Sequence, residues 1–252
     1  MAVLGVSALV FTVVEAVHLT QARAYRGIAP VCRVETSEKV IGLSFDDGPD
    51  PTLTPRIVRL LEEYSGRATF FVIGEHAEAH PDLIELAARA GMEIGNHTWS
   101  HQHLDDLSIA KATSESRRTM AFLTSISIDA SLFRAPFGEI PADSLRAIEA
   151  SGLTPIHWSL PLDGYLGGDG LDAADAADAI ARDVRPGDIV LAHDARDRAL
   201  TRASTVETLR LLLPELVARG FQVVTVSRLL ELGTSVRAEP RPWFWQSGFN
   251  CP

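Results

Sequence analysis

The sequence predicts an α/β fold in which short parallel strands alternate with helices, in a sheet that is either doubly wound or closed into a barrel. From residue 39 onward, short runs rich in Val, Ile, Leu and Phe alternate with longer amphipathic stretches. Most of the short runs are continuously apolar, as expected for strands that are buried on both faces. Because alternating βα units imply a parallel sheet, these two observations define the class of fold.

Seven strands and six helices are predicted. The strands are Lys39–Ser44, Ala68–Ile73, Glu93–Asn96, Leu132–Arg134, Thr154–Trp158, Asp188–Ala192 and Gln222–Thr225. The helices are Thr54–Tyr64, Asp82–Ala90, Ile109–Ser125, Asp143–Ala150, Ala173–Val184 and Val206–Arg219. Gly91, Gly152 and Gly220 stand where three of these helices should end and turn toward the next strand. Seven strands suggest a barrel in which one unit is missing or irregular.

The composition is typical of a globular enzyme with one domain. Of the 252 residues, 46% are hydrophobic, and the mean hydropathy of +0.09 excludes wholesale disorder. We expect a lead-in segment over residues 1–38, the barrel over 39–232 and a tail over 233–252 that packs on the barrel. The aromatic residues of the tail are expected to cover a hydrophobic patch; they are Trp243, Phe244, Trp245 and Phe249.

The net charge argues against nucleic acid as the main partner. The chain has 23 Lys and Arg against 33 Asp and Glu, which gives a formal charge of −10. Phosphate binding needs clustered basic residues, and the sequence has no dense basic run. The oligomeric state is not predicted.

The N-terminus allows several interpretations. The apolar run Ala2–Val14 is shorter than the roughly 20 residues that a membrane-spanning helix needs. It is long enough for the core of a signal peptide, and Ala22-Arg23-Ala24 offers a small-x-small cleavage pattern. No basic residue precedes the run, so a clipped membrane anchor and an ordinary N-terminal helix remain alternatives. We expect export or anchoring at the cell envelope, with possible membrane association through this segment; a cytoplasmic location is the alternative.

The two cysteines, Cys32 and Cys251, lie near opposite ends of the chain. Two cysteines cannot form a four-cysteine zinc site, and their separation matches no redox motif. In an exported protein they could form a disulfide that ties the termini together, whereas in the cytosol both would be free thiols.

Polar residues with chemical potential follow the predicted strands, at the point where each strand ends. In chain order they are Asp46 and Asp47, His97, Arg134, Asp163 and His193. In a parallel barrel the active site is built at the carboxyl ends of the strands. We therefore expect these side chains to converge on one rim.

Asp46 and Asp47 precede Gly48-Pro49, so two carboxylates stand side by side on a tight turn, where a nearby cation would relieve their repulsion. The alternative is a turn that only uses the turn-forming chemistry of Asp, Gly and Pro. His97 and His101 are spaced i, i+4 and could face the same way within one helical turn. Two imidazoles and one carboxylate would bind Zn²⁺ or a similar metal and leave positions open for water. His103 breaks this spacing and is interpreted as a bystander.

Arg134 and His193 offer further chemistry. The guanidinium of Arg134 is suited to holding a carboxylate, although a surface ion pair is the alternative. His193 ends a buried strand and could titrate near neutral pH as a general acid.

Taken together, these motifs resemble the polysaccharide deacetylase family, which carries the NodB homology domain and is carbohydrate esterase family 4. The similarity spans roughly residues 39–232. The motifs are Ser-Phe-Asp-Asp-Gly-Pro at 44–49, His-Thr-Trp-Ser-His at 97–101, Arg-Ala-Pro-Phe-Gly at 134–138 and Leu-Ala-His at 191–193. The connecting segment 68–74 and residues 95–97 also look like the family.

The resemblance implies a distorted (β/α)7 barrel of parallel strands and gives each motif residue a role. Asp46 matches the catalytic base and Arg134 the residue that orients it. Asp47, His97 and His101 match the ligands of one divalent metal, with Zn²⁺ expected and Co²⁺ or another ion as alternatives. His193 matches the general acid. Leu191 matches the wall of the acetyl-methyl pocket, and the backbone N–H of Phe137 matches a donor to the oxyanion.

One family motif is altered in this chain. Where the family has Trp, several residues and then Asp-Trp, here Trp158 is followed by Ser-Leu-Pro-Leu-Asp163-Gly-Tyr165. Asp163 is the candidate for the acid that tunes Arg134 or His193, and Tyr165 for the displaced aromatic residue that faces the sugar.

The resemblance implies metal-dependent removal of N-acetyl groups from an amino-sugar polymer such as peptidoglycan or a chitin-like chain. The alternatives on the same scaffold are an O-deacetylase of xylan and a deformylase or deacetylase of a lipid-linked sugar. A non-catalytic carbohydrate-binding relative would lack a base, ligand or acid, and none is missing here. A non-haem iron oxygenase would also use two His and one carboxylate, but the adjacent Asp-Asp pair on a parallel barrel argues against it.

Overall fold

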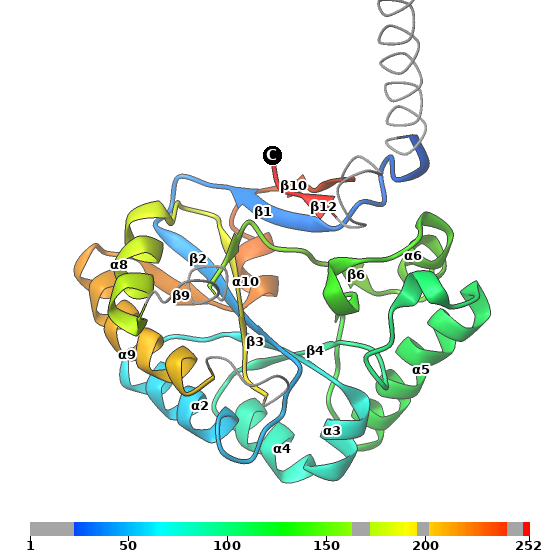
Figure 1. The fold of residues 1–252 in the computed structure, drawn as a ribbon, viewed down its shortest axis with the longest axis horizontal. Coiled ribbons are helices and arrows are strands. Elements are labelled where there is room, and N and C mark those ends of the chain that lie inside the picture. The colour runs from blue at the N-terminus through cyan, green and yellow to red at the C-terminus, as the bar shows by residue number, and fades with distance from the viewer. Residues whose placement is uncertain (1–22, 163–171, 196–201, 241–248) are drawn as a thin grey trace, which may run out of the picture.

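The computed structural model describes residues 23–162, 172–195, 202–240 and 249–252. Its main element is an eight-stranded parallel sheet in the order β6-β5-β4-β3-β2-β8-β7, with β9 beside the first half of β2. The strands are β2 (Val40–Asp46), β3 (Thr69–Val72), β4 (Glu93–Asn96), β5 (Leu132–Phe133), β6 (Thr154–Pro155), β7 (Leu160–Pro161), β8 (Ile189–His193) and β9 (Gln222–Val224). The sheet curls into a half-barrel with helices around it (Figure 1).

The central strand β2 sets the position of its neighbours. All seven of its residues are buried, in agreement with its apolar sequence VIGLSFD. Its register places Asp46 opposite Phe71 of β3 on one side and opposite His193 of β8 on the other. The carboxyl ends of these three strands therefore coincide, and the polar residues that follow them meet at one rim.

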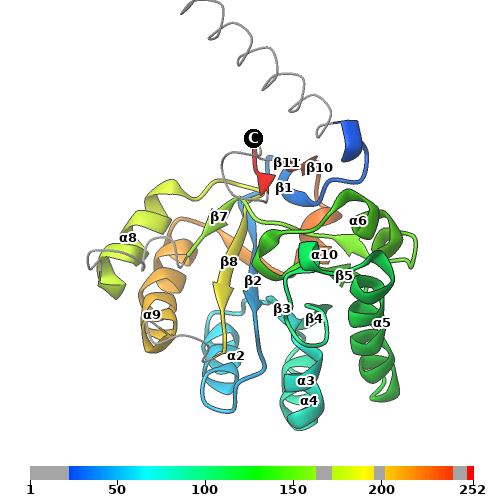
Figure 2. The same ribbon diagram turned by 45° about the vertical axis from the view of Figure 1, so that its right-hand side comes forward.

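Helices cover the outside of the sheet, as two views show (Figures 1 and 2). They are α2 (Thr54–Glu63), α3 (Gly74–Ala79), α4 (Pro81–Arg89), α5 (Ile109–Ser125), α6 (Ala142–Glu149), α8 (Ala173–Asp183) and α9 (Arg202–Ala218). The short helix α10 (Val226–Leu230) lies instead in the middle of the molecule, where Val226 and Leu229 pack in one cluster with Phe71 and Ile189. Two short 3-10 turns, η1 (Leu104–Asp106) and η2 (Pro136–Gly138), lie in the loops of the rim.

Four of the helices, α2, α4, α6 and α8, clearly separate an apolar from a polar face. In α2, for example, Ile57, Val58 and Leu61 face the core, and Pro55 fits the first turn, where no backbone donor is required. In α8, Asp172 caps the first turn by accepting from the backbone N–H groups of the second and third helical residues.

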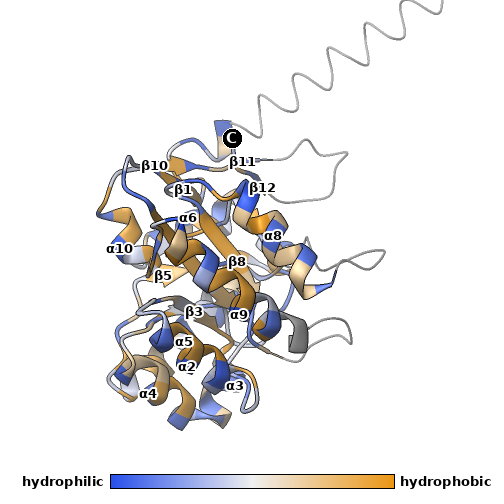
Figure 3. Ribbon diagram, turned by 90° about the vertical axis from the view of Figure 1, so that its left-hand side faces the viewer, coloured by the Kyte–Doolittle hydropathy of each residue, from blue (hydrophilic) through white to orange (hydrophobic). Residues whose placement is uncertain are grey.

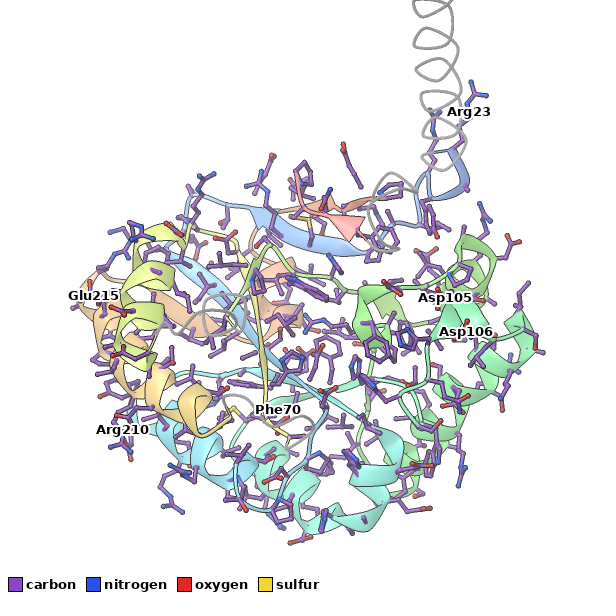
Figure 4. The ribbon with its side chains drawn as sticks, in the orientation of Figure 1. Arg23, Phe70, Asp105, Asp106, Arg210 and Glu215 are labelled. Atoms are coloured by element: carbon purple, nitrogen blue, oxygen red, sulfur yellow. A yellow bond between two sulfur atoms is a disulfide. The ribbon has the colours of Figure 1, made fainter. Side chains whose placement is uncertain are left out.

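The core lies between the sheet and the helices. The rings of Phe45 and Phe70 stack there with their centroids 5.0 Å apart. The ribbon of β8 is coloured hydrophobic along its length, and that of α9 in part (Figure 3). Phe70 points into the body of the molecule, whereas Arg210 and Glu215 on α9 point outward (Figure 4). This is the inside–outside division that the amphipathic pattern predicts.

The predicted fold class is confirmed, and all seven predicted strands are present. Four of them are shorter than predicted: β3 loses one residue at each end, β5 ends at Phe133, β6 ends at Pro155 and β9 ends at Val224. The six predicted helices are present, with ends that differ by a few residues. The prediction missed α3, α10 and the two-residue strand β7, which are too short to produce a periodic pattern.

The two ends of the described chain meet at one side of the barrel. The strand β1 (Val31–Glu35) pairs antiparallel with β10 (Thr234–Arg237), and β11 (Glu239–Pro240) pairs with β12 (Phe249–Asn250) (Figure 1). Neither pair was predicted from the sequence. Phe249 is buried, and its ring contacts those of Tyr25 and His157, so it covers a hydrophobic patch as expected. Trp243, Phe244 and Trp245 lie outside the described residues.

A disulfide between Cys32 and Cys251 joins the same two ends, which is the first of the two alternatives for these cysteines. Within the described ranges, no helix combines the length and the apolar character needed to cross a bilayer. The apolar run Ala2–Val14 lies outside those ranges.

The double variant Cys32→Ser/Cys251→Ser should lose about 2–5 kcal/mol of unfolding free energy, because the bridge spans 219 residues and restricts the unfolded chain. Denaturant titration of both proteins measures this loss. The wild-type protein under reducing conditions should match the variant. An unchanged midpoint in both would show that the bridge does not stabilise the fold.

Candidate active site

The end of β2 carries two buried carboxylates. Asp46 is the last residue of the strand, and Asp47 is the first residue of the turn that follows. They are 3% and 8% exposed. Asp47 adopts a φ of 75°, and this backbone conformation directs its side chain differently from that of Asp46. The two aspartates therefore lie in different environments.

Asp46 faces Arg134, which follows β5 and is fully buried. Nη1 of Arg134 donates a hydrogen bond to Asp46 Oδ1 at 2.6 Å, and Nη2 donates one to the backbone oxygen of His157 at 3.1 Å. The guanidinium also lies over the ring of Phe71, 4.1 Å from its centroid. Burial lowers the pKa of Arg134, and the charge of Asp46 opposes that shift. The ion pair is buried, so the surface alternative for Arg134 is wrong.

Asp47 faces two histidines. The Nε2 atoms of His101 and His97 lie 3.1 Å and 3.4 Å from Asp47 Oδ1. One candidate ligand atom from each residue lies within 4.8 Å of the others. Two imidazoles and one carboxylate at this separation fit the donor set of a catalytic Zn²⁺ site, which keeps an open position for water. The three residues predicted as ligands are therefore brought together.

The orientation of His97 is set by a hydrogen bond behind it. Its Nδ1 lies 2.9 Å from the backbone oxygen of Arg134, so Nδ1 carries the proton and donates. In the neutral imidazole, Nε2 therefore carries the lone pair and can bind a metal ion beside Asp47. A histidine held in this way is a pre-oriented metal ligand.

The argument from helical spacing is wrong for His97 and His101, although the residues are right. Residues 97–101 form an irregular loop, in which Thr98 and His101 have φ values of 67° and 55°. The loop is held by hydrogen bonds from Gly74 N–H to Thr98 O and from Thr98 N–H to the side chain of Asn96. The two imidazoles converge because of these backbone turns.

The remaining predicted residues lie around this cluster. His193 Nε2 is 3.9 Å from Asp47 Oδ2, and Leu191 is buried two residues earlier in β8. Phe137 has a φ of 59° and a side chain that is 45% exposed, with its ring 4.7 Å from that of His101. Asp163 and Tyr165 lie outside the described residues.

Three neighbours of the site were not identified from the sequence. His76 lies with Nδ1 2.7 Å from the backbone oxygen of Asp47. Asp194 is a buried carboxylate directly after His193, and it accepts a hydrogen bond from Thr54. His103, interpreted as a bystander, stacks on Phe137 with ring centroids 3.7 Å apart. These contacts join residues that are far apart in the sequence, so no local sequence pattern predicts them.

The charges of the cluster are strongly coupled. Burial opposes ionisation of Asp47, but hydrogen bonds from His101 and His97 hold its pKa well below the ordinary range. Burial also disfavours a charged His97, yet the carboxylates of Asp46 and Asp47 raise the pKa of its imidazolium. The site therefore attracts positive charge, as a proton on His97 or as a cation between the three side chains.

A curled parallel sheet with a carboxylate–histidine cluster at the carboxyl ends of its strands defines a barrel enzyme with its active site at that rim. Comparison with known proteins places the chain within this class. Residues 33–156 match the polysaccharide deacetylase family, and this range includes Asp46, Asp47, His97, His101 and Arg134. The chain belongs to the polysaccharide deacetylase family.

Individual relatives agree. The chain is 35% identical to a peptidoglycan-N-acetylglucosamine deacetylase of Bacillus cereus over 198 residues, which cover 78% of this chain and 91% of the relative. It is 37% identical to a chitooligosaccharide deacetylase of Sinorhizobium fredii, with 76% and 92% covered. Among solved structures, a peptidoglycan deacetylase of Bacillus subtilis superposes with a TM-score of 0.68 at 30% identity, with 79% of this chain and 93% of that one covered.

Metal binding should strengthen as pH rises, because His97 must lose its proton before Nε2 can bind an ion. The raised pKa of His97 means that protons compete with the ion up to a higher pH than at an ordinary histidine. In the metal-free protein, the stability from protonated His97 is present below its unfolded pKa and lost as pH rises through the folded one. Calorimetric titration with Zn²⁺ in buffers of different ionisation enthalpy should detect proton release near pH 7. Equal affinities at pH 6 and 8 without proton release would contradict this.

Proposed function

We propose that this protein is a metal-dependent deacetylase that removes N-acetyl groups from amino sugars of a polysaccharide, either peptidoglycan or a chitin-like chain. The observation that carries the proposal is the placement of Asp46 and His193, partners on adjacent strands, beside the Asp47–His97–His101 cluster. Asp46 Oδ2 lies 3.8 Å from His97 Nε2, and His193 Nε2 lies 3.9 Å from Asp47 Oδ2. An acid and a base thus lie beside the same cluster.

A divalent ion bound by Asp47, His97 and His101 would polarise the acyl carbonyl and lower the pKa of a nearby water. His₂Asp ligation suits Zn²⁺, and Co²⁺ is a further candidate. The negative charge of the cluster supports a cation at this place, because burial alone would make two adjacent carboxylates costly.

Asp46 is the base in this proposal. Arg134 holds its Oδ1 at 2.6 Å, so Oδ2 is the oxygen directed toward the cluster, where it can take a proton from the attacking water. The resulting C–O bond converts the amide carbonyl into an oxyanion. The backbone N–H of Phe137 is the proposed donor to this oxygen. Phe137 has a positive φ, and its ring lies beside that of His101.

His193 completes the reaction as the acid. Its side chain is 27% exposed, so it can contact both the site and an incoming glycan. Protonation of the nitrogen as the C–N bond breaks gives a free amino sugar and acetate, which balances one water consumed. Leu191, buried beside it in β8, would face the acetyl methyl group, and Asp163 and Tyr165 are proposed to tune the acid and the sugar-facing wall.

The names of the relatives support this substrate class, because they specify peptidoglycan and chitooligosaccharide as the molecules those proteins deacetylate. We further propose that the protein acts outside the cytoplasm, at the cell envelope. The disulfide between Cys32 and Cys251 supports this location, because such bonds persist in oxidising compartments.

Asp46→Asn and His193→Ala should each lower kcat by about 10²–10⁴-fold, since each removes one proton-transfer group. Both variants should still bind Zn²⁺, because neither residue is a proposed ligand. Asp143→Asn, which changes an exposed aspartate paired with Arg146, is the matched control and should keep full activity. Acetate release with metal content measured in parallel tests the assignment. Near-normal turnover in either variant would remove that residue from the mechanism.

Zn²⁺-loaded protein should release acetate from peptidoglycan or chitooligosaccharides and leave a free amine detectable by mass. The same panel should include acetylxylan and formylated lipid-linked sugars. Release from acetylxylan alone would show an O-deacetylase, and formate release would show a deformylase. No release from any of them by a metal-loaded protein would contradict hydrolytic function.

A further inference from the structure

Behind the site, the ends of β2 and β8 are joined by two buried side chains that the proposed reaction does not use. Asp194, directly after His193, is 1% exposed, and Thr54, the first residue of α2, is 2% exposed. The Thr54 hydroxyl donates to Asp194 Oδ2 at 2.5 Å and accepts from the backbone N–H of Asp50 at 2.8 Å. One hydroxyl thus links the strand that carries the acid to the turn that follows the base.

The same turn is tied to Asp194 in two further ways. The backbone N–H of Asp194 donates to the backbone oxygen of Asp46 at 3.2 Å. Gly48 lies so close to the carboxylate that a Cβ at this position would come within 2.2 Å of Asp194 Oδ1. Only a glycine allows this approach. The turn that carries Asp46 and Asp47 is therefore packed directly against the carboxylate of Asp194.

The turn has little freedom to adjust on its own. Asp50 Oδ1 accepts from the backbone N–H groups of Thr52 and Leu53 at 2.7 Å and 2.9 Å. The backbone oxygen of Asp50 accepts from Thr54 at 3.1 Å. A displacement of Thr54 would therefore disturb the hydrogen bonds that hold residues 50–54, directly after Asp47, Gly48 and Pro49.

The carboxylate of Asp194 is a costly group at this place. Burial raises its pKa to about 7, opposed by the Thr54 hydrogen bond and reinforced by the charges of Asp47 and Asp46. Its Oδ1 atom has no hydrogen-bond partner among the residues that the structure describes. A well-packed apolar pair at these two positions would avoid the cost of burying a carboxylate. The contact between Thr54 and Asp194 is therefore better explained by how it positions the two strand ends than by a gain in folding stability.

We propose that Thr54 and Asp194 form a positioning brace that sets the distance between the base and metal-ligand turn of β2 and the general acid at the end of β8. This inference rests on the proposed function for the roles of Asp46 and His193. Neither brace residue touches the reacting atoms; they act through the backbone of residues 46–50 and 193–194.

The chain contains a matched control for this contact. Thr69, at the start of β3, is also fully buried, and its hydroxyl donates to Glu93 Oε2 at 2.6 Å and accepts from the backbone N–H of Val226 at 2.8 Å. The bonding pattern is the same as at Thr54, but Thr69 lies at the amino end of its strand. That end of the sheet is opposite the rim that carries the site.

The test compares Thr54→Val with Thr69→Val, which remove the same hydroxyl from the two bridges. Both should lower the melting temperature by similar amounts, because each leaves a carboxylate and a backbone donor without the hydroxyl. Only Thr54→Val should lower kcat and weaken Zn²⁺ binding, each by roughly 10–100-fold, with a change in KM of less than about threefold. Thr54→Ser keeps the hydroxyl and should restore both values to within about threefold of the wild type.

If Thr54→Val matches Thr69→Val in kcat and in Zn²⁺ affinity, the contact is only structural and the proposal is overturned. A Thr54→Ser variant as impaired as Thr54→Val would overturn it too. If either valine variant fails to fold, Thr54→Ala and Thr69→Ala carry the same comparison. The Zn²⁺ affinity does not depend on the substrate, so a wild-type protein without deacetylase activity would contradict the proposed function while leaving this measurement valid.

Discussion

Three carboxylates lie buried at the ends of β2 and β8, and their mutual repulsion is the constraint on which the rest of the site depends. Asp46, Asp47 and Asp194 are each less than 10% exposed. Each of these carboxylates is stabilised by different neighbours. Asp46 pairs with the buried Arg134, Asp47 faces two imidazoles, and Asp194 is held by the hydroxyl of Thr54 with a raised pKa. Three equal side chains thus acquire three different roles through their neighbours.

The same constraint explains why the rim is built from unusual backbone rather than from helices. Asp47, Thr98, His101 and Phe137 all have positive φ values, which non-glycine residues adopt only where the surroundings compensate the cost. Here the compensation comes from a rigid sheet, whose register aligns Asp46 with His193 and Val72 with Asn96. The strands fix the starting points of the loops, and the strained turns then direct the side chains inward. The terminal strands pair at one side of the half-barrel (Figure 1), and the disulfide between Cys32 and Cys251 joins them.

Most of the fold could be read from the chain, and the exceptions have a common cause. Most strands of the core are predominantly apolar runs, such as VIGLSFD in β2, so their burial is visible in the sequence. The elements that were missed are short, such as β7 with two residues, or depend on distant partners, such as β1 with β10. For the site, the motifs identified the residues that bear the chemistry. The geometry assumed for His97 and His101 was wrong, because an i, i+4 spacing is compatible with both a helical turn and an irregular loop.

What the sequence by itself determined is therefore the set of chemical groups and their order at the strand ends, because residue type and strand pattern are local properties. The tertiary structure alone decided how those groups are paired. Asp46 and Arg134 are 88 residues apart, and Thr54 and Asp194 are 140 apart, so neither contact leaves a local signal. Asp46, the last residue of β2, meets the guanidinium, whereas Asp47, with its positive φ, meets the imidazoles. The turn that holds them contacts β8, α2 and α3, which only the folded chain brings together.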